Sequence, residues 1–385
     1  MNPQSIISYY PTYSILDILI NRNRCRVINF FIDVKSVISP LYIKDNAALL
    51  VSEVEKMGKI SYDIFSSIVE FIHWHKKYCI KRGVLSRFFL FSDSGDSFYH
   101  LNIYKKYKEK RKIGNFQFLD IPQREKFFNV ININMEMLEI FLNKIPNIYF
   151  LNLINLETDF IPYYLISRSS YLKNKHNLNI TYSIDKDLAQ NLIFDNSFIF
   201  YRKGKIKKIL EKKNAMGSIF GNDFNSIDIN FFPLVLSVLG DMSDSIPKVK
   251  GIGNKTFYKI FSDFLLILKE KDNMKIVFDL IGEGKEIFLD GCVITDKHIK
   301  NIVNEEKNNN LISNNMKLIS FELLSREFDD PSSTEMLERR KKIISKIINK
   351  KEVEPEKMEK FLEEINVYFS EENFLDIFYK QIKVI

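Results

Sequence analysis

Residues Leu239–Thr256 read LGDMSDSIPKVKGIGNKT, and the rest of the chain is organised around this stretch. Asp241 and Asp244 are three residues apart, so on a helical turn their carboxylates would share one face. Gly251 and Gly253 flank a single apolar residue, a spacing that predicts a tight turn with positive φ or close backbone approach. Where such a turn leads into a helix, the N–H groups at the helix start can hold a phosphate. Two interpretations remain open here: a metal-binding acid pair beside a phosphate clamp, or a helix that ends in an ordinary glycine turn.

The composition narrows the class of protein. A chain of 385 residues with 45% hydrophobic and 14% aromatic residues can bury a substantial core and is long enough for two domains. The net charge of +7 indicates a mild preference for a polyanionic partner. Cys25, Cys79 and Cys292 are scattered, which speaks against a disulfide framework or a zinc site and favours a reducing cytoplasm. We expect no signal peptide and no membrane span, since no apolar run approaches about 18 residues.

Four short apolar runs predict buried β-strands, and acidic residues follow each of them. The runs are 27–32, 88–91, 148–154 and 180–184, with a weaker fifth at 198–201. Helical periodicity between them, clearest at 60–72 and 135–145, favours an α/β fold with a mostly parallel sheet. One acid after a strand is ordinarily a turn residue or a helix cap. Because ligands bind beyond the carboxyl ends of parallel strands, four successive cases favour a shared site.

Eight acids make up the candidate site: Asp33, Asp93, Glu157, Asp159, Asp185, Asp187, Asp241 and Asp244. So many carboxylates in one place repel one another strongly unless cations neutralise them. Oxygen ligands without Cys or His suit Mg²⁺ or Mn²⁺. Two such ions about 4 Å apart can activate a water molecule and stabilise the leaving oxygen of a phosphodiester. The acids therefore predict metal-assisted phosphodiester hydrolysis.

Three basic runs are candidates for a phosphate-binding surface. The first, 104–112, reads YKKYKEKRK, and its interleaved tyrosines suit single-stranded nucleic acid through phosphate contact and base stacking. A solvated helix face gives the same pattern, but the position of this run after an acid-bearing strand favours nucleic acid. The second run, 202–213, fits a β-hairpin or a loop on the duplex side. The third, 339–351, is typical of an ordinary amphipathic helix.

Taken together, these segments resemble the structure-specific 5′ nucleases: flap endonucleases, phage RNase H-type 5′–3′ exonucleases and the 5′-nuclease domain of bacterial DNA polymerase I. The segments that carry the resemblance are FFID ending at Asp33, LFSDSGDSF with Asp93 and then YKKYKEKR, LETD with Glu157 and Asp159, SIDKDLAQ with Asp185 and Asp187, and the stretch 239–256. They occur in the family's order over about residues 26–265. SIDKDLAQ and GDMSDSIP followed by GIGNKT are the most specific of them.

The resemblance implies a PIN-like α/β nuclease domain with a mostly parallel sheet and a helical arch. A helix-three-turn-helix module that binds duplex DNA and a helical C-terminal region would follow it. The implied boundaries are 1–25 for an N-terminal extension, 26–230 for the nuclease domain with its arch at about 96–130, 231–300 for the helix-three-turn-helix module and 301–385 for the C-terminal region.

The resemblance also implies roles for individual residues. One metal would be held by Asp33, Asp93, Glu157 and Asp159, and the second by Asp185, Asp187, Asp241 and Asp244, which makes two Mg²⁺ or Mn²⁺ ions. Asp33, Lys108 and Arg111 would be catalytic, with the two basic residues at the arch base contacting the scissile phosphate. The implied DNA-binding residues are Tyr104, Lys105, Tyr107, Lys108, Arg111, Gly251, Gly253, Lys255 and Thr256, with a K⁺ ion at the Gly251–Gly253 turn.

The implied reaction is Mg²⁺-dependent hydrolysis that leaves a 5′-phosphate, in replication or repair. Its substrates would be DNA with 5′ flaps, nicks or RNA–DNA primer junctions. We expect a cytoplasmic monomer, in the host cytoplasm if a phage encodes it. Near the end of the chain, Leu375, Phe378 and Tyr379 resemble a sliding-clamp-binding box, although a helix that packs these side chains into the core is the simpler interpretation.

Four positions depart from the family's pattern. Phe160 stands where another Asp is usual, Tyr99 where an arginine is frequent, and Ser245 and Lys248 where Asn and Gly are usual. All eight acids are present, so the departures bear on tuning more than on activity. Two alternatives remain: a catalytically silent junction-binding protein of the same fold, and a PIN-type ribonuclease that cleaves single-stranded RNA. The turn at Gly251 argues against the ribonuclease, since its implied role is to grip duplex.

Overall fold

The computed structural model divides into two compact units, each built from separate stretches of chain. The sheet unit comprises Met1–Ser97, Phe116–Glu211 and Glu327–Ile385, and the helical unit comprises Phe98–Asn115 and Lys212–Arg326. The structure describes residues 13–35, 37–38, 54–95, 97–109, 121–203, 206–268, 288–289, 292–293 and 297–330. The predicted boundaries at 25, 230 and 300 follow the resemblance and stay predictions.

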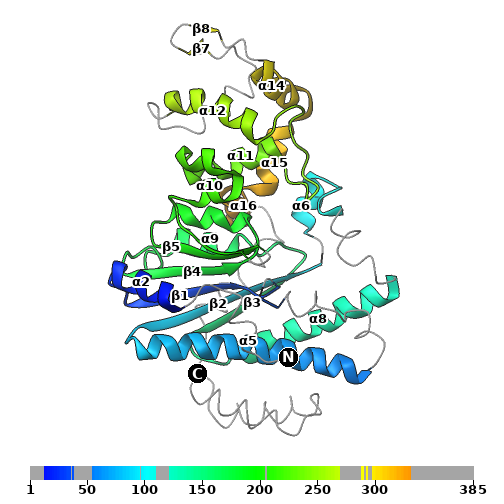
Figure 1. Ribbon diagram of the computed structural model, residues 1–385. Helices are drawn as coiled ribbons and strands as arrows, with labels where there is room; N and C mark the ends of the chain where they lie inside the picture. The colour runs from blue at the N-terminus through cyan, green and yellow to red at the C-terminus, as the bar shows by residue number, and fades with distance from the viewer. Residues whose placement is uncertain are drawn as a thin grey trace. The chain divides into compact units, whose positions relative to one another are not determined.

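A six-stranded, mostly parallel sheet forms the centre of the sheet unit (Figure 1). Its strands are β1 (Val27–Asp33), β2 (Leu85–Ser94), β3 (Ile148–Ile154), β4 (Asn177–Ser183), β5 (Ser197–Lys203) and β6 (Ile206–Leu210). They lie in the order β3-β2-β1-β4-β5-β6, and every neighbouring pair is parallel except β5 with β6. The predicted α/β class is confirmed. The basic run at 202–213 contributes to an antiparallel hairpin, one of its two predicted forms.

Aromatic side chains hold neighbouring strands in register on both faces of the sheet. Phe30 of β1 lies opposite Phe88 of β2, and their stacked rings have centroids 5.0 Å apart. On the other face Phe31 stacks on Phe89, with centroids 4.9 Å apart. Such cross-strand pairs stabilise a sheet beyond simple burial. These strands are buried on both faces, which explains why they appear in the sequence as continuous apolar runs instead of alternating ones.

Helices cover both faces of this sheet. The sheet unit contains α2 (Tyr13–Asn23), α5 (Val54–Lys81), α8 (Ile121–Leu142), α9 (Ile161–Arg168), the 3₁₀ helix η1 (Asp187–Ile193) and the end of α16 (Phe321–Asp329). Figure 1 shows α5 and α8 beneath the sheet and α9 above it. The buried isoleucines at 64, 68 and 72 of α5 join Phe30, Met135 and Phe141 in one core cluster. The four-residue spacing of those isoleucines is what predicted this helix.

Three buried asparagines run across the sheet. The side-chain N–H of Asn29 donates to the Asn179 Oδ1 atom at 3.0 Å, and Asn179 donates to the Leu172 carbonyl at 2.8 Å. Asn196 donates to the carbonyl oxygens of Leu172 and Asn177 at 2.7 and 2.9 Å. A buried amide network of this kind is stabilising only while its members are paired. It fixes the loop that precedes β4 against the sheet.

Replacing Asn179 by Ala should therefore lower the free energy of unfolding by about 2–4 kcal/mol, because buried partners lose their hydrogen bonds. Urea unfolding followed by circular dichroism measures the effect. Lys175→Ala, at an exposed position just before β4, is the control and should change stability by less than about 0.5 kcal/mol. Equal stability of the two variants would show that the network is not structural.

His75 of α5 is a second buried polar group in this core. Its Nδ1–H donates to the Phe71 carbonyl, and its Nε2 accepts from the Tyr182 hydroxyl, both at 2.7 Å. Desolvation by burial lowers the pKa of His75 from 6.5 to about 4, so the folded protein keeps the ring neutral at physiological pH.

This shift predicts a loss of stability in mild acid. Below pH 6.5 the unfolded chain takes up a proton on His75, whereas the folded chain does so only near pH 4. The contribution of neutral His75 to the free energy of unfolding is therefore complete above pH 6.5 and is lost as the pH falls towards 4. The free energy of unfolding should fall by up to about 3 kcal/mol over this range. Urea unfolding at several pH values would show it, and His75→Gln should flatten the slope relative to a His176→Gln control. An unchanged slope in His75→Gln would contradict the assignment.

The helical unit is built mainly from helices. They are α6 (Phe98–Ile103), α10 (Ala215–Phe220), the 3₁₀ helices η2 (Asn222–Ser226) and η3 (Ile229–Phe231), α11 (Phe232–Leu239), α12 (Asn254–Leu268), α14 (Lys297–Asn309) and α15 (Leu311–Ile319), with a small hairpin of β7 (Phe288–Leu289) and β8 (Cys292–Val293). Buried Asn315 of α15 donates to the carbonyls of Ser237 and Pro247, at 2.7 and 2.8 Å. These two bonds join α15 to α11 and to the loop that follows it.

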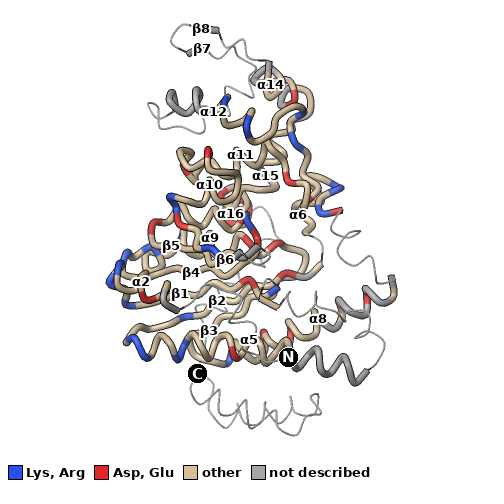
Figure 2. Tube along the Cα trace, in the orientation of Figure 1, with Lys and Arg blue, Asp and Glu red and all other residues tan. Residues whose placement is uncertain are grey.

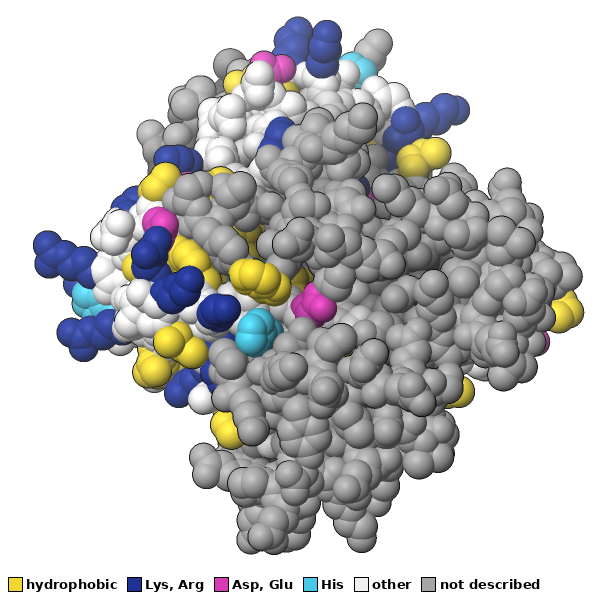
Figure 3. Space-filling model, turned by 60° about the horizontal axis from the view of Figure 1, so that its bottom comes forward, with side chains coloured by type: hydrophobic (Ala, Val, Ile, Leu, Met, Phe, Trp, Pro, Cys, Tyr) yellow, Lys and Arg dark blue, Asp and Glu magenta, His cyan; other side chains and the backbone are white. Residues whose placement is uncertain are grey.

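Some sequence predictions fall outside the described residues. They concern Lys110, Arg111 and Lys112 of the first basic run, the basic run at 339–351 and the clamp-box residues at 375–379. Of the helices that the structure describes, none has the length and apolar content needed to span a bilayer. In the view of Figure 3, described Lys and Arg side chains lie at several separate places.

Candidate metal centre and nucleic-acid interface

Six of the predicted acids follow four adjacent strands of the sheet unit. Because β3, β2, β1 and β4 are neighbours and parallel, their carboxyl ends lie along one side of the sheet, which we call the acid edge. Its acids are Asp33 at the end of β1, Asp93 near the end of β2, Glu157 and Asp159 after β3, and Asp185 and Asp187 after β4. All six are half-buried. Figure 2 shows the Asp and Glu positions of the chain in red. The topology thus gives the acid edge that the strand pattern predicted.

A serine on β4 links two of these acids. The Ser183 hydroxyl donates to the Asp33 Oδ2 atom at 3.0 Å and accepts from the backbone N–H of Asp185 at 2.9 Å. The N–H of Asp187 in turn donates to the Asp185 Oδ1 atom at 2.9 Å. These short-range bonds hold the carboxylates at defined places before any ligand arrives. Ser183 is the first residue of the SIDKDLAQ segment, although the sequence analysis gave this serine no role of its own.

Lys35 is a residue of the acid edge that the sequence reasoning missed. It follows Asp33 by two residues, and its ammonium group forms an ion pair with the Asp93 carboxylate. A lysine here offsets part of the repulsion between neighbouring carboxylates. A cation that binds Asp93 must compete with this amine for the same oxygen.

The loops after β2 and β3 approach each other closely. Gly95 has φ +75°, and a Cβ atom there would lie 2.2 Å from the Asn155 Oδ1 atom. Asn155 itself has φ +57°. Glycine at position 95 therefore allows both the turn and the approach. This contact joins the loop that follows Asp93 to the loop that carries Glu157 and Asp159.

Phe160, the main departure from the family's pattern, has a structural role. Its ring is fully buried and packs edge-on against Phe328 of α16, with centroids 5.3 Å apart. Phe328 also packs against Tyr164, whose hydroxyl donates to Asp329 at 2.9 Å. The position where the resemblance implied an acid thus anchors the loop of Glu157 and Asp159 to the last described helix.

Restoring an acid at this position should damage the protein instead of improving a metal site. Phe160→Asp would bury a carboxylate among aromatic rings and should lower the free energy of unfolding by at least about 3 kcal/mol. Phe160→Leu, the control, should lower it by about 1–1.5 kcal/mol. Urea unfolding of both variants tests this, and an aspartate variant as stable as the parent would contradict it.

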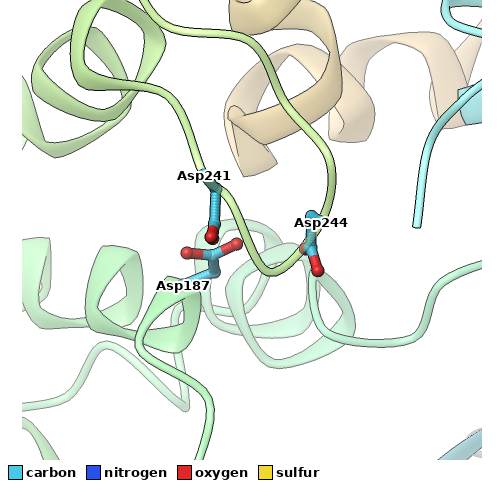
Figure 4. A group of neighbouring side chains, drawn as sticks. All are labelled: Asp187, Asp241 and Asp244. Carbon is cyan, nitrogen blue, oxygen red and sulfur yellow. The ribbon is translucent and has the colours of Figure 1, made fainter. Parts of the chain in front are cut away.

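Asp241 and Asp244 lie on the loop that follows α11 in the helical unit, and Figure 4 draws them together with Asp187. Both are buried, with 4% and 3% of their surface exposed. The Asp241 Oδ1 atom accepts from the Ser243 N–H at 2.9 Å and from its hydroxyl at 2.6 Å. Backbone bonds pair Asp241 with Ile246 and close the loop. The two acids therefore sit in a compact turn and not on a shared helical face.

Gly240 is the glycine whose missing side chain this loop requires. It has φ +69°, and a Cβ there would lie 2.8 Å from the Ile246 carbonyl oxygen and 2.8 Å from the Lys248 nitrogen. Gly251 has φ +78°, as the predicted turn requires, but no described atom lies within 4 Å of its Cβ position. The same open space surrounds Gly253. The backbone of residues 246–248 thus approaches Gly240 closely, and the sequence analysis assigned no role to this glycine.

The glycine turn leads into α12 as the motif predicts. Gly251, Gly253 and Lys255 are exposed, and Thr256 is half-buried in the first turn of the helix. Exposed backbone N–H groups at a helix start favour an anion. The duplex contact and the K⁺ ion implied at this turn stay predictions, as does the helix-three-turn-helix geometry.

The described part of the first basic run is tied to the acid-bearing loop. The backbone N–H of Lys108 donates to the Asp244 carbonyl at 2.8 Å, and Lys108 has φ +54°. Tyr107 is buried and stacks on His100, with centroids 4.7 Å apart. Tyr104 is half-buried and Lys105 is exposed. Tyr107 therefore has a packing role, and of the two predicted stacking tyrosines only Tyr104 lines the surface.

Comparisons with known proteins identify this fold. No protein-family model matches the chain, and no curated protein matches its sequence. Among solved structures, a bacteriophage T5 5′-exonuclease with bound zinc is 17% identical, with a TM-score of 0.54, covering 89% of this chain and 99% of that one. The T5 D15 protein crystallised with metal ions is 17% identical, with a TM-score of 0.53, and the match covers 89% of this chain and 99% of that one. The T5 D15 flap endonuclease in a complex with DNA and metal ions is 16% identical, with a TM-score of 0.53, and the match covers 89% of this chain and 100% of that one.

The chain thus has the PIN-like fold of the phage 5′ nucleases. The predicted resemblance to structure-specific 5′ nucleases is confirmed for the fold, over most of this chain and nearly all of the T5 proteins. Because the sequence identity is low, this likeness shows a shared backbone fold and not a shared activity. The residues at the acid edge are consistent with divalent metal binding.

Proposed function

We propose that this protein is a metal-dependent 5′ nuclease that cuts DNA at 5′ flaps, nicks or primer junctions, in replication or repair. The observation that carries the proposal is the acid edge, where six acids follow four adjacent parallel strands. The fold alone would leave the activity open, because one fold hosts many functions. A row of carboxylates with ordered hydrogen bonds is what phosphodiester hydrolysis with divalent metals needs.

The donor set of the acid edge fits Mg²⁺ or Mn²⁺. Among the described residues that follow these strands, the candidate ligands are carboxylates only, which are hard oxygen donors. Asp33, Asp93, Glu157 and Asp159 would hold one ion. Asp185 and Asp187 would hold the other with Asp241 and Asp244 of the helical unit. When bound, such ions supply a water nucleophile near neutral pH and neutralise charge on the leaving oxygen.

The remaining steps belong to groups of this chain. Lys108 would bind a non-bridging oxygen of the scissile phosphate, together with Arg111, and thereby orient the bond for in-line attack. The exposed backbone at the Gly251 turn and Lys255 would bind phosphates of the paired region. Ser183 keeps Asp33 and Asp185 at fixed positions, so little reorganisation is needed when substrate binds. The solved T5 flap endonuclease complex contains DNA and metal ions, which supports DNA as the substrate.

A second candidate, a junction-binding protein without cleavage, is favoured by one observation. Lys35 pairs with Asp93 at the acid edge, and a lysine that occupied this place permanently would keep a cation out. Such a protein would bind flap DNA with a strong dependence on salt and leave it intact. The first candidate has the larger support, since the pair is partly exposed and a divalent ion can displace an amine.

Cleavage of a 5′-labelled flap substrate in Mg²⁺ decides between the two. We expect Mg²⁺-dependent cleavage that EDTA abolishes, and a loss of at least about 100-fold in Asp185→Asn, because a carboxylate ligand of the second metal ion is neutralised. Asp223→Asn, an exposed acid of η2, is the matched control and should cleave normally.

Flap binding without cleavage by the parent protein would establish the junction-binding alternative instead. Cleavage that persists in Asp185→Asn would remove the proposed metal site. A PIN-type ribonuclease would be shown by cutting of single-stranded RNA without any need for duplex. Thermal unfolding of each variant separates loss of activity from loss of fold.

A further inference from the structure

The loops that enter the parallel strands of the sheet unit carry a charge opposite to that of the acid edge. These loops lie at residues 24–26, 82–84, 143–147, 169–176 and 194–196, before β1 to β5 respectively. The structure describes all of their residues, and the one acid among them is Asp195. We call the Lys and Arg residues of these loops the basic edge: Arg24, Arg26, Arg82, Lys144, Lys173 and Lys175.

Strand pairing brings three of these loops together. Val27 of β1 lies opposite both Leu85 of β2 and Asn177 of β4, so the three strands begin at the same level. The Arg26 N–H donates to the His176 carbonyl at 2.8 Å, and the Leu85 N–H donates to the Arg26 carbonyl at 3.0 Å. The loop before β1 is thus fixed between the loops before β2 and β4. Figure 2 shows Lys and Arg positions in blue around α2 and the strand ends beside it.

Part of the basic edge is neutralised by a neighbouring acid and part is not. Asp17 of α2 accepts two hydrogen bonds from Arg82, at 2.6 and 2.8 Å. Arg24, Arg26 and Lys175 are exposed, and no carboxylate of the described residues lies within ion-pair distance of them. Surfaces of soluble domains ordinarily intersperse charges of both signs. These cations on adjoining loops are therefore available to an external anion.

The basic edge does not serve to balance the acid edge. β1 has seven residues, so at a rise of about 3.3 Å per residue its two ends lie about 20 Å apart. The Debye length is about 8 Å at physiological ionic strength, so exposed charges at that separation are largely screened from each other. The acid edge has a cation of its own in Lys35. The basic edge therefore needs a separate anionic partner.

The chemistry of this surface favours the phosphate backbone of duplex DNA. Cations on several adjoining loops match a row of phosphates better than one isolated anion. A single strand would need open aromatic rings for stacking, but the Arg87 guanidinium lies over the exposed Tyr171 ring, 4.4 Å from its centroid. An acidic protein would bury an apolar centre, and Leu85 is the one exposed apolar residue that begins a described strand of this sheet.

We propose that the basic edge binds the phosphate backbone of duplex DNA, as a second site remote from the acid edge. Binding there is independent of sequence, because phosphate contacts carry no base information. The inference goes beyond the proposed nuclease site and does not depend on cleavage. A second attachment point raises the local concentration of DNA around the protein, which keeps the protein near its substrate between encounters.

The test is a capture experiment with the full chain in EDTA. A short 5′-flap DNA is immobilised and saturated with protein, and a fluorescent duplex closed by a hairpin at each end is then added. The closed duplex has no 5′ end, so it does not compete as a flap. We expect the parent protein to retain the closed duplex at low salt and to release it as the salt concentration rises.

Matched variants locate the contact. Arg26→Gln combined with Lys175→Gln should reduce capture at least about tenfold and lower the salt dependence by about two phosphate contacts, with flap binding unchanged. Lys317→Gln combined with Arg326→Gln removes the same charges from exposed positions of the helical unit and should capture normally. Arg26→Lys combined with Lys175→Arg keeps the charge and should also capture normally. Thermal unfolding verifies that each variant is folded.

Equal capture by the parent protein and the Arg26→Gln, Lys175→Gln variant would overturn the inference. A parent protein that binds the flap without retaining the closed duplex would also overturn it. If the flap does not bind, fluorescence anisotropy of the closed duplex alone decides through the same comparison of variants.

Two further outcomes separate this inference from its alternatives. A parent protein that binds polyglutamate and not the closed duplex would assign the basic edge to an acidic protein and overturn the DNA assignment. A protein that never cleaves flaps but captures the closed duplex through Arg26 and Lys175 would keep this second site and lose the proposed nuclease function.

Discussion

The parallel pairing of β3, β2, β1 and β4 is the constraint on which the functional architecture depends. Parallel strands need crossover connections, so every strand in this set ends at the same side of the sheet. The acids that follow the strands are far apart in sequence and adjacent in the fold. Like charges placed side by side store electrostatic energy, which Lys35 and ordered hydrogen bonds reduce only in part. The fold therefore accepts a local penalty that a bound cation would relieve.

The sequence predicted those parts of the structure that follow from local pattern. Continuous apolar runs marked β1 to β5, because these strands are buried on both faces, and isoleucines four residues apart marked α5. The acids after the runs could be predicted to share an edge once the sheet was taken as parallel. A strand was harder to predict where apolar and charged residues are mixed. Strand β6 lies in a lysine-rich segment that fitted either a hairpin or a loop.

The remaining features depend on contacts between residues distant in sequence. Lys35 pairs with Asp93, and Phe160 packs against Phe328, neither of which any local pattern encodes. The glycines show the same difference between local and distant signals. A positive φ at Gly251 follows from local turn chemistry, but the close approach at Gly240 depends on where residues 246 and 248 return. Tyr107 was predicted to stack on bases, whereas its ring stacks on His100 of the preceding helix α6, a contact that composition alone does not reveal.

The contact between Phe160 and α16 has a consequence for the order of assembly. The loop that carries Glu157 and Asp159 precedes its packing partner Phe328 in the sequence, so the loop is synthesised first. Proteins emerge from the ribosome N-terminus first, at about 5–20 residues per second. During synthesis the β3 strand and its acids therefore wait for α16 before the loop acquires its final support. A partly made chain has its acidic residues but not their packing, which delays a competent acid edge until nearly all the described chain is present.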